Sequence, residues 1–177
     1  DKWNDPEGVL EVFKLLKNKV DCRLVLCGNM AMDDPEGYQI YERVRRKANN
    51  LVKNGDVMLI TSENNILVNV LQRSSAVIVQ KSLREGFGLT VTEALWKGKP
   101  VVASHIGGIP EQIEDGRNGF LVDPQDLQGT ADRIVEILRY PKLAEELGKR
   151  GKETVREKFL ITRILLDYLC LLNDIMG

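Results

Sequence analysis

The stretch at residues 82–94 constrains the fold more than any other part of this chain. An apolar run at residues 76–80 leads into it, and a helical pattern that contains Ala94 leads out of it. Between them, Gly86 and Gly88 bracket one aromatic residue, which permits a sharp turn and close approach of a ligand to the backbone. A strand that turns through glycines into a helix leaves unpaired N–H groups at the helix start, with the helix dipole behind them. The stretch therefore predicts an anion site that favours a phosphate.

The predicted donors at this turn are the N–H groups of Gly88, Leu89 and Thr90. Glu85 and Glu93 flank them, with seven residues between the two carboxylates. A carboxylate beside a diphosphate would be repelled by it, whereas an ionised carboxylate makes strong hydrogen bonds to hydroxyl donors. The pattern therefore indicates a ligand with a phosphate centre and hydroxyl-rich rings on either side, which describes a nucleotide sugar.

Purely structural interpretations of these residues stay open. Residues 90–93 (TVTE) fit a capping box in which Thr90 is the N-cap. Glu93 and Lys97 are four positions apart and can form a helical ion pair worth about 0.2–0.5 kcal/mol. Glu85 can be a solvated loop charge. We favour the functional interpretation because the strand, the glycine turn and the helix occur together.

The composition excludes several classes of protein. A length of 177 residues fits one domain, and 43% hydrophobic with 29% charged residues is typical of a globular protein. A net charge of −1 argues against a nucleic-acid-binding module. The sequence has no long uncharged apolar run, so it predicts no membrane span. The cysteines are odd in number and show no paired short spacing, which indicates free thiols in a reducing cytoplasm. His105 is the only histidine and is expected in a loop, so we expect no metal site.

Short apolar runs alternate with helical patterns along the chain. The predicted strands are residues 23–27, 57–60, 76–80, 100–103 and 119–122. The sequence DPEG occurs twice, at residues 5–8 and 34–37, and each copy is typical of a helix start with Asp at the N-cap and Pro at the first position. Alternating strands and helices predict an α/β domain whose parallel sheet carries helices on both faces. Ligands of such sheets bind beyond the carboxyl ends of the strands, where residues 82–94 are expected.

Residues 85–93 resemble the Glu-x7-Glu signature of the retaining, nucleotide-sugar-dependent glycosyltransferases of the GT-B fold, the group 1 family. The resemblance continues, in the order and at the spacing of the family, through residues 98–103 (GKPVVA), 107–111 (GGIPE) and 115–122 (DGRNGFLV). Within the family, the trehalose glycosyltransferring synthases look most similar, on the basis of residues 33–37 (DDPEG), 82–85 (SLRE) and 94–98 (ALWKG).

The resemblance implies the C-terminal half of a GT-B fold. Residues 1–158 would then form a single Rossmann-like domain that binds the donor, with its first strand missing ahead of Asp1. Residues 159–177 would form a helical C-terminal tail that crosses to an absent N-terminal acceptor domain. Simple packing of this tail onto residues 1–158 is the alternative, and an exposed tail could also pair with another chain as a homodimer.

The resemblance also implies an activity, the transfer of a hexose, with glucose expected, from a nucleoside diphosphate sugar to a sugar acceptor. UDP- or ADP-glucose is the expected donor, glucose the expected acceptor to give trehalose, and no cofactor or metal is expected. Glu85 would be the catalytic residue that orients the donor sugar. The implied donor-binding residues are Lys81, Arg84, Gly86, Phe87, Gly88, Leu89, Thr90 and Glu93. Because the acceptor site would lie in the absent domain, this chain alone is expected to bind donor without turnover.

Other functions compete with this one. A non-catalytic module that senses nucleotide sugars would keep the same turn, and another GT-B enzyme could use an unrelated acceptor. An NAD-dependent dehydrogenase would require a Gly-x-Gly-x-x-Gly fingerprint after the first strand, which residues 28–33 lack. The chain also departs from the family at Asn4, which stands near the place of a Lys that helps to bind the donor phosphates.

Overall fold

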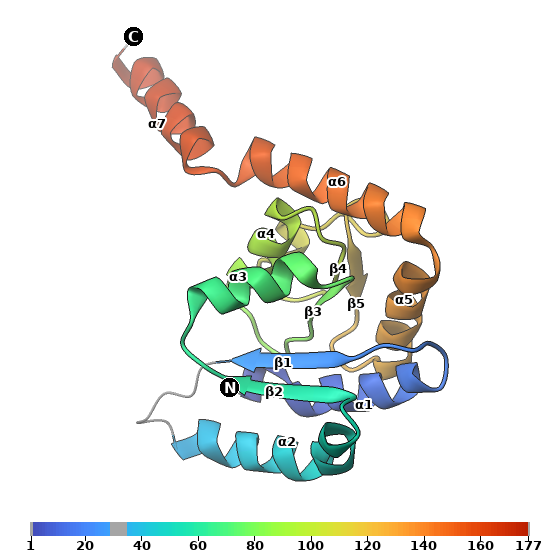
Figure 1. The fold of residues 1–177 in the computed structure, drawn as a ribbon. Helices are drawn as coiled ribbons and strands as arrows, with labels where there is room; N and C mark the ends of the chain where they lie inside the picture. The colour runs from blue at the N-terminus through green and yellow to red at the C-terminus, as the bar shows by residue number, and fades with distance from the viewer. Residues whose placement is uncertain (1, 29–34, 177) are drawn as a thin grey trace.

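A computed structural model describes residues 2–28 and 35–176 of the chain (Figure 1). The strands are β1 (Leu24–Gly28), β2 (Val57–Thr61), β3 (Ile78–Gln80), β4 (Val101–Ser104) and β5 (Phe120–Val122). The α-helices are α1 (Pro6–Lys17), α2 (Pro35–Lys53), α3 (Asn65–Ser74), α4 (Leu89–Trp96), α5 (Leu127–Arg139), α6 (Pro141–Lys158) and α7 (Ile161–Met176). Two 3-10 helices are η1 (Lys2–Asn4) and η2 (Ile109–Glu111). Within the described ranges, no helix is both long enough and apolar enough to cross a membrane.

The strands form two parallel sheets. β1 pairs with β2 from Leu24 opposite Val57 onward, and β4 lies between β3 and β5. The expected α/β class, with parallel strands, flanking helices and a helical tail, is confirmed. In the part of the chain that the structure describes, β1 and β3 are each paired on one side only, so the predicted single sheet is divided in two.

Helix α1 begins as the sequence predicts. Asp5 is the N-cap, Pro6 occupies the first helical position, and an Asp5 side-chain oxygen accepts from the N–H of Gly8 at 3.0 Å. The second predicted N-cap, Asp34, lies outside the described residues, but the helix that follows it begins at Pro35. The same tetrapeptide thus precedes a helix in both places, because Pro already has the φ angle that the first turn requires.

The apolar side chains form two buried clusters. The larger one lies among α1, α2 and α5, with Leu10 and Ala131 fully buried. The smaller one surrounds α4, where Val91 and Leu95 pack against β4 and the segment after it. Because α4 is fixed by this second cluster, its first turn has a defined position at the carboxyl end of β3.

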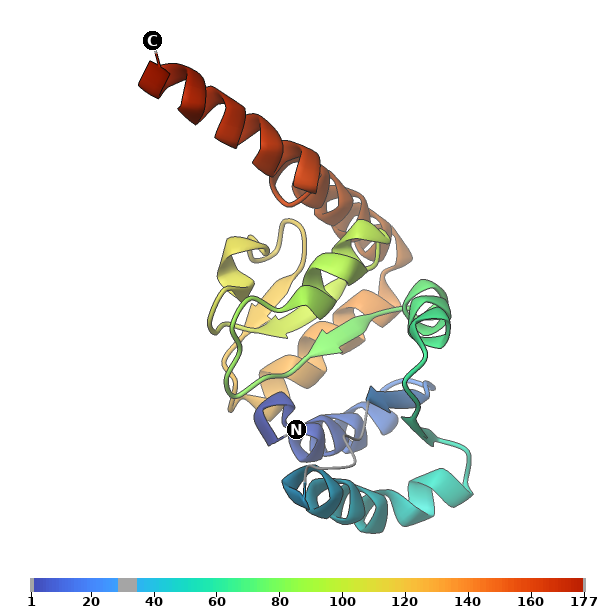
Figure 2. The same cartoon turned by 90° about the vertical axis from the view of Figure 1, so that its left-hand side faces the viewer.

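Helix α7 extends away from the rest of the chain (Figures 1 and 2). Every residue from Ile161 to Met176 is exposed, although much of the helix is apolar. Leu169, for example, is 53% exposed. The tail is thus not buried against residues 1–158 in this structure, and its crossing to another domain stays a prediction.

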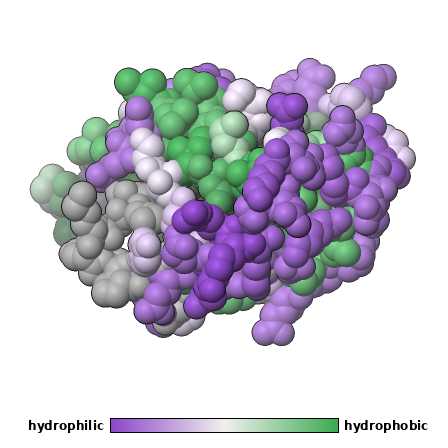
Figure 3. Space-filling view, turned by 60° about the horizontal axis from the view of Figure 1, so that its bottom comes forward, coloured by the Kyte–Doolittle hydropathy of each residue, from purple (hydrophilic) through white to green (hydrophobic). Residues whose placement is uncertain are grey.

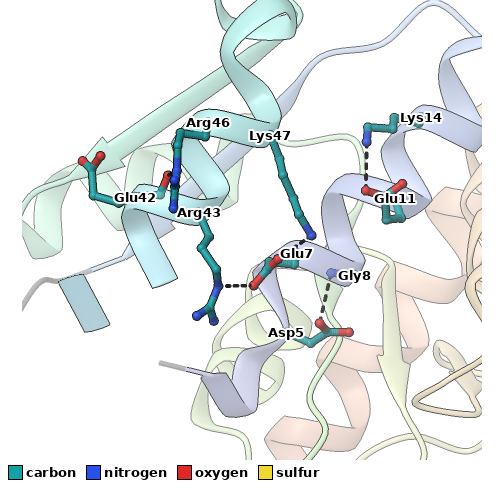
Figure 4. Close-up of polar contacts among 9 residues, drawn as sticks. All are labelled: Asp5, Glu7, Gly8, Glu11, Lys14, Glu42, Arg43, Arg46 and Lys47. Carbon is teal, nitrogen blue, oxygen red and sulfur yellow. Dashed lines mark hydrogen bonds and ion pairs between the residues drawn. The ribbon is translucent and has the colours of Figure 1, made fainter. Parts of the chain in front are cut away.

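The side of the molecule that carries α2 combines a mainly hydrophilic surface with one large apolar area (Figure 3). Arg43 and Lys47 of the basic run on α2 are exposed. These two side chains converge on Glu7 at the start of α1 (Figure 4), with N–O distances of 2.9 Å for Arg43 and 2.5 Å for Lys47. Hydrogen bonds from Lys47 and Arg43 lower the pKa of Glu7 below its ordinary value of 4.5. The basic run thus ties α2 to α1, in addition to being solvated.

Candidate functional site

The glycine turn after β3 has the predicted form. Gly88 adopts φ +86° and is the N-cap of α4, and it contributes no side chain to the cap. The capping-box alternative is therefore wrong, because Thr90 lies inside the helix. A Cβ on Gly88 would also lie 3.1 Å from Ile109, so both the backbone torsion and the space select glycine.

The start of α4 presents free donors. Among the described residues, the N–H groups of Gly88, Leu89 and Thr90 donate to no protein acceptor. Leu89 and Thr90 are exposed, whereas Gly88 is buried. The Gly88 carbonyl is already engaged by the N–H of Val91 at 2.9 Å, which aligns the first turn. Free N–H groups at the positive end of a helix dipole are suited to bind a phosphate.

Glu85 is held in place by donors from its own loop and from the last residue of β3. Its Oε1 accepts from the N–H of Gly86 at 3.0 Å, and its Oε2 lies 3.3 Å from Nε2 of Gln80 and 3.4 Å from Oγ of Ser82. The side chain is half-buried. It is therefore an oriented group and not the freely solvated charge of the structural alternative.

Glu93 is exposed on α4 and takes a hydrogen bond from Nε2 of Gln72 at 3.1 Å. Lys97 donates to Oε1 of the same amide at 2.6 Å. The helical ion pair that the spacing permits is not formed between these two described residues, because the amide of Gln72 lies between them. The carboxylate keeps lone pairs that can accept hydroxyl donors.

The two predicted cations lie in different surroundings. Lys81 is buried, and its Nζ pairs with Asp5 and donates to the carbonyl of Pro124 at 2.8 Å. Arg84 is exposed, and its guanidinium lies 5.4 Å from the centre of the Trp3 ring. Of the two, only Arg84 is exposed to a ligand at the surface.

Backbone contacts fix the predicted glycine loop. The N–H of Gly108 donates to the carbonyl of Gly86 at 2.6 Å. Gly107 has φ +58°, and a Cβ there would lie 2.0 Å from the carbonyl oxygen of Glu85. Phe87 packs edge-on against Phe159, with ring centres 5.7 Å apart. The predicted residues of this loop thus lie together, closed on one side by residues 107–108.

Sequence reasoning missed Gln112, which is 1% exposed. Its Nε2 donates to the carbonyl of Phe87, and its Oε1 accepts from Oγ1 of Thr92 at 2.6 Å. Asn118 in turn donates to the Gln112 carbonyl at 3.0 Å. Gln112 therefore connects the glycine turn to the first turns of α4. The only sequence signal is its place directly after the GGIPE segment.

His105 follows β4 in a loop, as predicted, and lines a hollow of about 510 Å³ with Asp115, Asp123 and their neighbours. Over residues 2–28 and 35–176, no three His, Cys, Asp or Glu side chains are placed to hold a metal ion together. The three cysteines are free thiols, as predicted. Burial raises the pKa of Cys22 above its ordinary value of 9.0.

Comparison with known proteins identifies the family of the chain. Residues 1–154 match the family described as Glycosyl transferases group 1. The chain belongs to the group 1 glycosyl transferases. Trehalose synthases of Pyrococcus horikoshii and Rubrobacter xylanophilus are 42% and 44% identical to this group 1 chain, over 181 residues in each case. Each comparison covers 100% of the chain and 42% of the relative, so the chain spans less than half of these enzymes.

The chain is also similar to a less closely related enzyme and to solved structures. A trehalose phosphorylase of Grifola frondosa is 33% identical over 83% of this group 1 chain and 20% of its own length. A solved sucrose-phosphate synthase of Thermosynechococcus elongatus has a TM-score of 0.84 at 27% identity, and 99% of this chain covers 43% of that one. Anabaena Alr3699/HepE, solved in complex with UDP, has a TM-score of 0.85 at 20% identity, and 98% of this chain covers 46% of it. The expected GT-B type of fold is therefore confirmed.

Proposed function

We propose that this chain is the donor-binding half of a retaining glycosyltransferase that moves glucose from a nucleoside diphosphate sugar to a sugar acceptor. Glucose is the proposed acceptor, which gives trehalose, and UDP- or ADP-glucose is the proposed donor. The observation that carries the proposal is the turn at Gly88, where free N–H groups are flanked in the sequence by Glu85 and Glu93. Similarity to the trehalose synthases supports the choice of sugar and acceptor.

In the proposed mechanism, the N–H groups of Gly88, Leu89 and Thr90 bind the diphosphate. As the bond between the sugar and the phosphate breaks, negative charge grows on the leaving diphosphate. Donors that are already aligned stabilise this charge without reorganisation. Arg84 adds positive charge from the exposed side of the loop, and Lys81 supports the loop through Asp5. The bound diphosphate thus leaves with its charge compensated by the protein.

The two carboxylates bind the rings on either side of the diphosphate. Glu85, the proposed catalytic residue, orients the sugar by accepting from its hydroxyls, and Glu93 accepts from the ribose hydroxyls. Both carboxylates keep unused acceptor capacity after their contacts within the protein are counted. The acceptor sugar would be bound by another part of the enzyme, so this chain alone binds donor without turnover.

Similarity to the trehalose phosphorylase favours a second candidate, in which the donor is a sugar 1-phosphate and not a nucleotide sugar. Isothermal titration calorimetry of the chain with UDP, ADP, GDP and glucose 1-phosphate separates the two. Binding of at least one nucleotide supports the proposed function, and weakened binding of that nucleotide by Glu93→Ala supports the ribose contact. Binding of glucose 1-phosphate alone favours the phosphorylase. A folded chain that is indifferent to every nucleotide overturns the proposed function.

A further inference from the structure

The segment that precedes α1 lies along the loop that follows β3. The N–H of Leu83 donates to the carbonyl of Trp3 at 2.7 Å, and Arg84 lies over the Trp3 ring. Lys81 is buried against Asp5. Successive residues of the loop are thus attached to successive residues of the segment, although the two are far apart in the sequence. The loop that ends in Glu85 therefore has an external support along its length.

A polar cluster occupies the middle of this contact. Nε2 of Gln80 lies 2.9 Å from Oγ of Ser82 and 3.3 Å from Oδ1 of Asn4. Oγ of Ser82 lies 3.4 Å from the same Asn4 oxygen, and both donors also reach Oε2 of Glu85. Ser82 is fully buried. The cluster thus connects Asn4 to Glu85 through two side chains that the proposed function does not use.

The donors and acceptors of this cluster balance. The amide of Gln80 has two protons and the hydroxyl of Ser82 has one. The acceptors that they face are Oγ of Ser82, Oδ1 of Asn4 and Oε2 of Glu85. The three protons therefore match the three acceptors. Without Oδ1 of Asn4, one of the protons on Gln80 or Ser82 would have no acceptor in the cluster. The network is part-buried, with Ser82 inside and Asn4 exposed, and its matched donors and acceptors restrict how its side chains can turn.

The network also limits how Glu85 can turn. A carboxylate offers about four lone-pair positions. The network occupies Oε2, and the N–H of Gly86 occupies one position on Oε1. The remaining positions are those that a ligand hydroxyl can use, and their direction is fixed because both oxygens are anchored.

We propose that Gln80 and Ser82, aligned by Asn4, are positioning residues that fix the carboxylate of Glu85 for the hydroxyls of the donor sugar. This inference rests on the proposed function, because it assumes that Glu85 contacts the sugar. It predicts a selective effect. Loss of the network weakens the binding of the sugar part of the donor and leaves the binding of the nucleoside diphosphate part unchanged, since the latter depends on Gly88, Leu89 and Thr90.

The experiment measures two affinities for each variant by calorimetry, one for UDP- or ADP-glucose and one for the matching nucleoside diphosphate. Ser82→Ala and Gln80→Leu should each weaken nucleotide-sugar binding about tenfold, the effect of one hydrogen bond to a charged group, with the diphosphate affinity unchanged. Asn4→Ala should act in the same direction. Ser74→Ala and Asn50→Ala, at exposed positions on α3 and α2, are the matched controls and should change neither affinity.

The outcomes separate this inference from the proposed function. Failure of the unaltered chain to bind any nucleotide overturns the proposed function itself. If the unaltered chain binds both ligands, an equal loss of both affinities in Ser82→Ala and Gln80→Leu shows a general structural role and overturns the positioning role. Unchanged affinities in both variants overturn it as well. A loss confined to the nucleotide sugar supports it.

Discussion

Nε2 of Gln72 lies 3.1 Å from Oε2 of Glu93, and this contact separates the carboxylate from Lys97, the C-cap of its helix. Oε1 of the same amide accepts from Lys97 at 2.6 Å. Gln72 is 6% exposed, so its amide uses both of its ends inside the protein. Without it, residues four apart on a helix would be free to pair directly. The glutamine therefore keeps Glu93 available to a ligand.

Gln72→Leu should weaken nucleotide binding about tenfold, because Lys97 then turns to Glu93 and occupies the acceptor that the ribose needs. Calorimetry with the nucleotide that binds the unaltered chain measures the effect. Adding Lys97→Met to Gln72→Leu removes the competing cation and should recover part of the affinity. Gln128→Leu, at an exposed position on α5, is the control. An affinity that Gln72→Leu leaves intact contradicts this role.

Gly107→Ala should distort the loop that carries Glu85, because the added Cβ would lie 2.0 Å from a backbone oxygen of that residue. Gly55→Ala is a matched control, since Gly55 also has positive φ, +76°, but has open space around its Cβ position. The free energy of unfolding of the control should fall by about 1–2 kcal/mol, because alanine is disfavoured in the left-handed backbone conformation. Urea unfolding should show a larger loss for Gly107→Ala, together with weaker nucleotide binding. Equal losses in the two variants would show that the close approach does not matter.

Glu7→Gln should lower the free energy of unfolding at neutral pH by about 0.5–1 kcal/mol, the range of partly exposed ion pairs. Because Lys47 and Arg43 lower the pKa of Glu7 in the folded chain, the ionised carboxylate stabilises the fold. This stabilisation is complete above the ordinary pKa of 4.5 and is lost as the pH falls through the lowered pKa. Denaturant unfolding between pH 3 and 7 should therefore show the difference between the two chains shrinking toward acid. Glu11→Gln, which removes an exposed pair with Lys14 on the same helix, should show little effect at any pH. A pH-independent difference for Glu7→Gln would refute the linkage.

Leu169→Ala on α7 should change the free energy of unfolding by less than about 0.5 kcal/mol, because the side chain is 53% exposed. Leu147→Ala on α6 makes the same chemical change at a residue that is 1% exposed, and should cost about 2–5 kcal/mol. Urea unfolding of both variants measures the contrast. A large loss in Leu169→Ala would mean that α7 is packed in solution, against a partner that the described residues do not include.

The helix starts and the glycine turn could be predicted because their causes are local. Asp5 and Pro6 begin α1 through the backbone of the residues that directly follow, and Gly88 turns the chain through its own φ angle. The capping box at Thr90 failed for a local reason too, since two overlapping starts were possible and the glycine begins the helix earlier. Parallel pairing of the strands followed from the alternation of strands and helices, but their division into two sheets did not.

By itself, the sequence determined that a strand passes through a glycine turn into a helix, and that two carboxylates flank the turn. Only the tertiary structure decided which side chains orient those carboxylates. Gln72 contacts Glu93 from a distant part of the chain. Asn4 likewise contacts Gln80, which in turn contacts Glu85. Asp5 holds Lys81 in a buried ion pair. The physical reason is that torsion angles and helix caps depend on neighbours in sequence, whereas hydrogen bonds between side chains depend on packing that brings remote segments together.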